Sequence, residues 1–253
     1  MPEARYDVIG AEYGLTRRED ARIAALIHAS LGKARTIVNV GAGAGSYEPR
    51  DRHVLAIEPS EVMSAQRDPK LPPAIITGAY PLPLIDQSVD AAMAILTIHH
   101  WDKDQERGVK EMRRVARGPV VILTFDPEVS ASMWLMADYL PEVAELDRRI
   151  FPPPETLARW LDADVSVRKV PIPRDTPDWT LSSFWAHPER VLNAQARKST
   201  SGFARMPPDV VDRVVEAVER DLQDGTWDER HGRLRELDEY DAGMRLLVSE
   251  GHS

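Results

Sequence analysis

The sequence predicts an α/β fold, with a doubly wound, mostly parallel seven-stranded sheet and a helical, aromatic-rich cap inserted before the last strand. Three observations predict it. Strand-like and helix-like apolar patterns alternate through residues 36–125, as in a parallel sheet with crossover connections. A glycine-rich turn joins the first two of these strands. Beyond Asp126, prolines and tryptophans accumulate, which indicates cap structure.

The first elements are an amphipathic helix and a buried strand. Apolar residues between Ile23 and Leu31 recur with helical spacing, and Gly32 ends the pattern. β-branched residues between Ile37 and Val40 then favour a strand covered on both faces of a sheet.

The remaining elements follow from the same patterns. Strands are expected at 54–57, 74–77, 89–96, 120–125, 165–172 and 243–248, and helices at 60–66, 105–116, 133–146, 209–223 and 229–240. The expected division is an N-terminal lid and first helix (1–32), a cofactor-binding core (33–173), a cap insertion (174–240), and a last strand with its tail (241–253).

The glycine turn and the acid that ends the second strand predict a nucleoside site. Gly41, Gly43 and Gly45 let the backbone turn sharply and let a ligand approach it. Glu58 stands where an acid can accept both hydroxyls of an adenosine ribose. The third glycine of the dinucleotide fingerprint is missing from its usual place, which disfavours NAD or FAD. Pro49 also leaves only a short or irregular crossover helix, so a ligand without phosphate is expected.

The first half of the chain resembles the class I S-adenosylmethionine-dependent methyltransferases, in particular the small-molecule branch with a ubiquinone/menaquinone-methyltransferase-like core. The resemblance lies in residues 38–47, 56–60, 78–90, 96–101 and 120–126. It implies a Rossmann-like sheet, S-adenosylmethionine (SAM) as cofactor and S-adenosylhomocysteine (SAH) as product. The implied cofactor contacts are Tyr13, Arg17, Gly41, Ala42, Gly43, Gly45, Glu58, Pro59, Met63, Ala79, Tyr80, Leu96 and Thr97.

Two positions depart from the family pattern. Asn39 stands where an acid usually ends the motif of the first strand. Residues 77–83 lack the acid that commonly binds the adenine amino group, so we expect backbone groups near Ala79 and Tyr80 to hold adenine.

Composition limits the other partners. The chain has no cysteine, which excludes disulfides, thiolate zinc sites and a cysteine nucleophile. Its formal net charge of −9 opposes binding to nucleic acid, and no apolar run is long enough to span a bilayer. The acidic N-terminal residues do not form a signal peptide. We therefore expect a cytoplasmic monomer or homodimer that binds a small-molecule substrate without a metal.

Histidines after the fourth strand are the candidate catalytic groups. A base with a pKa near neutrality helps to deprotonate a phenol, alcohol or ammonium acceptor. Successive residues point in different directions, so one of His99 and His100 is expected to face the substrate, and His100 is favoured. The alternative is that both only hydrogen-bond the loop. His187, within the aromatic segment 179–188, is a second candidate. That segment either roofs the substrate pocket or fills the core of the cap.

The function predicted from these features is methyl transfer from SAM to O, N or C of a small, partly apolar molecule, in specialised metabolism. Three alternatives remain open. The cofactor site serves a cyclase, lyase or isomerase that transfers no methyl group, the chain is a non-catalytic cofactor-binding module, or it is a dinucleotide oxidoreductase.

Overall fold

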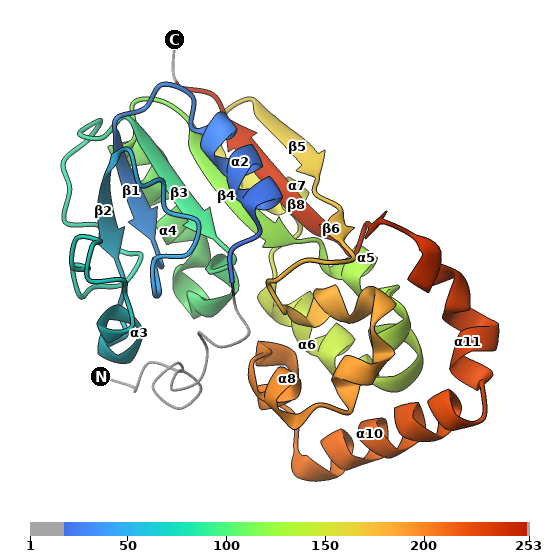
Figure 1. The fold of residues 1–253 in the computed structure, drawn as a ribbon. Coiled ribbons are helices and arrows are strands. Elements are labelled where there is room, and N and C mark those ends of the chain that lie inside the picture. The colour runs from blue at the N-terminus through green and yellow to red at the C-terminus, as the bar shows by residue number, and fades with distance from the viewer. Residues whose placement is uncertain (1–17, 252–253) are drawn as a thin grey trace.

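A computed structural model describes residues 18–251, and its centre is a six-stranded sheet (Figure 1). The strand order is β2-β1-β3-β4-β8-β5. The strands are β1 (Thr36–Val40), β2 (His53–Ile57), β3 (Ala91–Ile95), β4 (Val120–Phe125), β5 (Val165–Lys169) and β8 (Met244–Ser249). Strands β1 to β4 pair in parallel, whereas β8 runs antiparallel to both β4 and β5. The sheet is therefore mostly parallel, as predicted.

The prediction of a seventh strand at 74–77 was wrong for the described residues. There, Ile75 makes only an isolated parallel bridge to Ile57 at the end of β2. Pro72 and Pro73 stand directly before the segment 74–77, and they have no N–H group to donate to a strand ladder. The segment therefore lies beside β2 without extending into a strand.

Helices cover both faces of the sheet (Figure 1). Helix α2 (Ala21–Ser30) lies on one face, and helices α4 (Gln105–Val115) and α7 (Pro154–Leu161) lie on the other. The pleat of β3 shows the division. Ala91 and Met93 join the apolar cluster on the α2 side, whereas Ala92 and Ala94 join the cluster on the α4 side. This two-sided burial explains the continuous apolar sequence of the inner strands.

The connection between β1 and β2 has no helix, whereas the position of Pro49 predicted a short or irregular one. Helix α3 (Glu61–Ala65), which follows β2, is also short. Ser60 caps its N-terminus, because the Ser60 hydroxyl accepts a hydrogen bond from the amide of Met63. The 3₁₀ turns η2 (Ile98–His100) and η3 (Asp102–Asp104) connect β3 to α4.

Two segments form a second, helical region at the carboxyl ends of the parallel strands, which we call the helical subdomain (Figure 1). The first contains α5 (Pro127–Ala131), η4 (Leu135–Tyr139) and α6 (Pro141–Ile150). The second contains η5 (Leu181–Ala186), η6 (Pro188–Val191), α8 (Ala194–Lys198), α9 (Ser201–Ala204), α10 (Pro208–Gln223), α11 (Thr226–His231) and η7 (Gly232–Glu236). The short strands β6 (Ile172–Pro173) and β7 (Glu239–Tyr240) pair antiparallel, so the two ends of the second segment lie together.

Two of the expected helices are interrupted. The one expected at 133–146 is divided into η4 and α6, because Pro141 cannot continue a helix and instead starts the next one. In place of the helix expected at 229–240, the structure has the end of α11, then η7, and then β7. Within residues 18–251, no helix combines the length and apolar character needed to cross a membrane.

The aromatic side chains of 179–188 mainly fill the core of the helical subdomain. Phe184 and Trp185 are fully buried in it. The indole N–H of Trp134 donates a 3.0 Å hydrogen bond to the carbonyl of Trp185. Trp134 also meets Trp227 edge to face, with 5.4 Å between ring centroids. The segment was expected either to roof the substrate pocket or to fill the core of the cap. Phe184 and Trp185 fill the core.

Candidate functional site

The glycine turn after β1 is held against the end of β2 by backbone hydrogen bonds. The amides of Gly41 and Ala42 both donate to the carbonyl of Ile57, at 2.8 and 2.9 Å. Gly41, Gly43 and Gly45 all have positive φ angles, of 73°, 52° and 91°. The left-handed backbone explains why glycine stands at each of these positions.

The three glycines have different surroundings. A Cβ atom at Gly41 would lie 2.0 Å from Oγ1 of Thr97, and one at Gly45 would lie 2.5 Å from Cδ1 of Leu71. The first and third glycines are therefore required by the packing of the protein itself. At Gly43 the nearest atom is Cε of Met63, at an ordinary 3.5 Å. Gly43 is thus the glycine of this turn that leaves most space for a ligand.

Glu58 lies beside this open position. Its carboxylate accepts hydrogen bonds from the amide of Gly43 at 2.7 Å and from the amide of Ser60 at 2.9 Å. The side chain is buried, with 6% of its surface exposed. The two amides fix the acid between the turn and the start of α3, so its oxygens have defined positions before any ligand binds.

Asn39 belongs to a buried polar network under the same turn. Its side-chain N–H donates to Oε1 of Glu48 at 2.9 Å, and Glu48 forms a 2.8 Å ion pair with Arg67. Arg67 also donates to the carbonyl of Gly43 at 3.4 Å. Both charged side chains are almost completely buried, so each is stabilised by the other.

The network leaves one acceptor without a partner. The side-chain oxygen of Asn39 is buried and accepts no hydrogen bond in the described part of the chain. A buried acceptor of this kind fits an N–H donor such as the ammonium group of SAM. Together with the open position at Gly43 and the fixed carboxylate of Glu58, it makes the turn suitable for that cofactor.

The other predicted cofactor contacts have different surroundings. Pro59 is exposed next to Glu58, and Tyr80 is 44% exposed with the guanidinium of Arg107 over its ring. Ala79 is buried and packs against α4. Tyr13 and Arg17 lie outside the described residues.

A cavity of about 70 Å³ lies at the carboxyl ends of β3 and β4. The core contributes Leu96, His99 and Phe125, and the helical subdomain contributes the other walls. The complete lining is Leu96, His99, Phe125, Ser130, Met136, Val143, Asp147, Phe151, Thr180, Leu181, Ser182, Thr200, Ser201 and Gly202. Ligands in open parallel sheets bind at this edge, so the cavity has the position of a substrate pocket.

The two neighbouring histidines have different surroundings. His99 lines the cavity and stacks on Phe151, with ring centroids 4.1 Å apart. His100 is absent from the lining, and its Nδ1 lies 3.1 Å from a guanidinium nitrogen of Arg205. The structure therefore favours His99 as the histidine that faces the cavity, whereas the sequence favoured His100.

His187 lies elsewhere. Its Nε2 is 2.7 Å from the carbonyl of Arg174, and burial lowers the pKa of its imidazole. It is not among the residues that line the cavity. Residues 18–251 contain no cluster of three or more acids and histidines suited to a metal ion.

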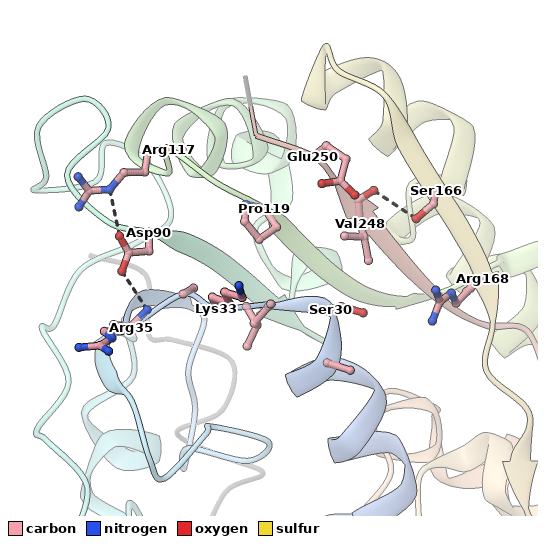
Figure 2. A pocket seen from close by; sticks show the side chains of 14 residues that line it. Ser30, Lys33, Arg35, Asp90, Arg117, Pro119, Ser166, Arg168, Val248 and Glu250 are labelled. Carbon is pink, nitrogen blue, oxygen red and sulfur yellow. Dashed lines mark hydrogen bonds and ion pairs between the residues drawn. The ribbon is translucent and has the colours of Figure 1, made fainter. Parts of the chain in front are cut away.

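A larger groove, of about 730 Å³, lies at the opposite ends of the parallel strands, next to their first residues (Figure 2). Asp90 links three residues of its wall region. Its carboxylate accepts hydrogen bonds from the amides of Arg35 and Thr36 and forms an ion pair with Arg117. These amides keep the pKa of Asp90 below its ordinary value. The groove contains none of the predicted site residues and faces the amino ends of the parallel strands, so we do not assign the site to it.

Three residues of the site were missed in the sequence. Glu48 and Arg67 support the turn, and Asp147 lines the cavity. The spacing of Val143, Asp147 and Phe151, four residues apart, is the signal that was available for Asp147, since it puts an acid between two apolar residues on one helical face.

Comparisons with known proteins identify the family. Residues 38–122 match a family model described as a methyltransferase domain. A search of curated proteins gave no match.

Solved structures extend the similarity to most of the chain. A protein from Anabaena variabilis, named a candidate methyltransferase of an antibiotic biosynthesis pathway, is 33% identical over 92% of this chain and 98% of its own, with a TM-score of 0.84.

Two more distant structures share the fold. Phosphoethanolamine N-methyltransferase 2 from Haemonchus contortus, solved with phosphomonomethylethanolamine and SAH, is 14% identical over 92% of this chain and 53% of its own, with a TM-score of 0.53. The 4+2 cyclase SpnF is 18% identical over 91% of this chain and 80% of its own, with a TM-score of 0.51.

The identity and coverage of the Anabaena protein, together with the matched domain, show the family. The chain belongs to the class I SAM-dependent methyltransferases, and SAM is its cofactor.

Proposed function

We propose that the protein transfers a methyl group from SAM to O, N or C of a small, partly apolar molecule that binds in the cavity. One observation carries this proposal. Leu96 lines the cavity, and the next residue, Thr97, lies against Gly41 in the glycine turn. One short segment thus connects the cofactor turn to the cavity, which supports a reaction between groups bound on its two sides.

We infer that Glu58 and Met63 hold the adenosyl part of SAM and that the turn at Gly43 holds its methionine part. The side-chain oxygen of Asn39 then accepts from its ammonium group. When bound, SAM supplies a methyl group on a positively charged sulfur. The protein then has to orient the acceptor in line with that sulfur and exclude water. The predominantly apolar walls of the cavity suit both tasks.

The helical subdomain supports a small acceptor. It supplies most of the cavity lining and leaves a confined space above the strand ends. The relative from an antibiotic biosynthesis pathway supports a place in specialised metabolism. As part of the same proposal, we assign the chain to the ubiquinone/menaquinone-methyltransferase-like branch, and infer a cytoplasmic monomer or homodimer that does not bind nucleic acid.

Calorimetry with SAH tests the cofactor site. Glu58→Ala is expected to weaken SAH binding by about 1 to 3 kcal/mol, the usual loss for a hydrogen bond to a charged group. Unchanged affinity in this variant would refute the role of Glu58.

Labelled SAM and a panel of small acceptors test the reaction. A labelled product together with SAH supports methyl transfer. Conversion of an acceptor without release of SAH would instead support a cyclase or lyase built on the same cofactor site.

A further inference from the structure

A carboxylate without a partner lies in the wall of the cavity. Asp147 is on α6 between Val143 and Phe151, and all three line the cavity because residues four apart share one helical face. No residue in the range 18–251 donates a hydrogen bond to its carboxylate or forms an ion pair with it. The proposed mechanism above leaves this acid unused.

The surroundings of Asp147 are mainly apolar and aromatic. Phe151 stacks on His99 on one side and meets Phe125 edge to face on the other, with centroids 4.1 and 6.2 Å apart. Burial raises the pKa of the Asp147 carboxyl to about 7, although the charge of Arg205 opposes this shift. Asp147 is half-buried, so its carboxyl keeps only part of the hydration that it has in the unfolded chain.

The charged and titratable groups around Asp147 come from two further elements. His99 lies across the cavity after β3, and Arg205 lies at the end of α9. Arg205 is within hydrogen-bonding distance of Nδ1 of His100 and forms no ion pair with Asp147. The remaining polar groups of the wall are neutral hydroxyls, among them Ser182 and Ser201.

We propose that the methyl acceptor is an amine and that its nitrogen binds Asp147. This inference rests on the proposed function. A protonated amine supplies the hydrogen bonds that the carboxylate lacks and adds charge complementarity. The aromatic wall also attracts a cation, and the net charge of −9 favours its approach. A carboxylic acid would place two like charges together, and an alcohol would supply one bond without charge.

Methylation of a protonated amine requires a group that accepts one proton, and Asp147 is that group. The ammonium gives one proton to the carboxylate of Asp147. The neutral nitrogen then uses its lone pair to form the N–C bond, and the electron pair of the C–S bond stays on sulfur. The products are the methylated ammonium, SAH and protonated Asp147, which releases its proton to water. The raised pKa of Asp147 suits a group that accepts and then releases a proton near neutral pH.

The test measures binding of matched probes to the full chain saturated with SAH. Benzylamine, benzyl alcohol and benzoate differ mainly in the polar group, and methylamine covers the case of a narrow cavity. By calorimetry, the amines are expected to bind at least about tenfold more tightly than the alcohol and benzoate. Asp147→Asn is expected to remove that preference, and Glu145→Gln, an exposed acid on the same helix, is expected to keep it.

Each outcome decides the proposal. It is overturned by equal or tighter binding of the alcohol or benzoate, by a preference for amines that survives in Asp147→Asn, or by failure of every amine to bind the SAH complex. SAH affinity is measured first in each variant and reports that the variant is folded. A wild-type chain that binds SAH but shows no preference for amines contradicts only this inference. A wild-type chain that fails to bind SAH contradicts the proposed function.

Discussion

Replacing Asp147 by Asn is expected to change how the stability of the protein depends on pH. The pKa of Asp147 rises from 3.8 to about 7 on folding, because burial removes part of the water around the carboxyl. Between these values the folded state holds a proton that the unfolded state has released. Stability from this group is therefore complete below pH 3.8 and is lost as the pH rises through about 7.

The shift sets the size of the effect. Each pH unit in this window changes the free energy of unfolding by about 1.4 kcal/mol per proton. From about pH 5 to about pH 8, the wild-type protein should lose roughly 2 to 3 kcal/mol through Asp147 alone. Asn does not titrate, so Asp147→Asn lacks this loss. Relative to the variant, the wild type becomes less stable as the pH rises.

Urea unfolding at a series of pH values measures the difference. All other titrating groups are shared by the two proteins, so their contributions largely cancel when the variant is subtracted from the wild type. Glu145→Gln removes an exposed acid from the same helix and should show no comparable dependence.

A stability difference between the wild type and Asp147→Asn that stays constant within about 0.5 kcal/mol across this range would refute the reasoning. It would mean that the carboxyl remains hydrated in the folded protein. A difference that changes in the opposite direction would mean that a cation pairs with the carboxylate.

Five further substitutions test other parts of the site. Arg67→Met should lower the free energy of unfolding by about 3 to 5 kcal/mol, because it leaves a buried carboxylate unpaired. Gly41→Ala should destabilise the protein more than Gly43→Ala, since only the former places Cβ too close to a neighbouring side chain, 2.0 Å from Oγ1 of Thr97, and Gly43→Ala should mainly weaken SAH binding. His99→Gln should lower turnover of an amine acceptor more than His100→Gln, because His99 lines the cavity.

For each of these predictions, one measurement gives a result that would contradict it. Denaturation of Arg67→Met at the wild-type urea midpoint would mean that the buried pair is not needed. Equal unfolding midpoints for the two alanine variants would mean that the turn adapts freely. Steady-state kinetics in which His100→Gln is the weaker enzyme would return His100 to the favoured position.

Much of the core was predictable because its signals are local. The apolar run before Gly41, the glycine turn and the acid at position 58 lie close together in sequence, and the structure joins the turn to Glu58 directly. Pro49 predicted a short or irregular crossover helix, and the structure has no helix at that place. The seventh strand was not predicted correctly, because the apolar pattern at 74–77 outweighed the effect of Pro72 and Pro73 on hydrogen bonding.

The rest depends on contacts between distant positions. Nothing near Glu48 in the sequence indicates that Arg67 will neutralise it, since the pairing forms only when the chain after β2 folds back over the turn. The environment of Asp147 depends on how α6, which Pro141 begins, packs against distant segments around the cavity. The lid residues Tyr13 and Arg17 remain predictions.

A crystal structure of the full chain with SAH tests the assignment of the site most directly. We expect the ribose hydroxyls within hydrogen-bonding distance of Glu58, the amino group near the side-chain oxygen of Asn39, and the sulfur directed toward the cavity that contains Asp147. SAH bound in the groove around Asp90, or bound at the turn with its sulfur directed away from that cavity, would contradict it.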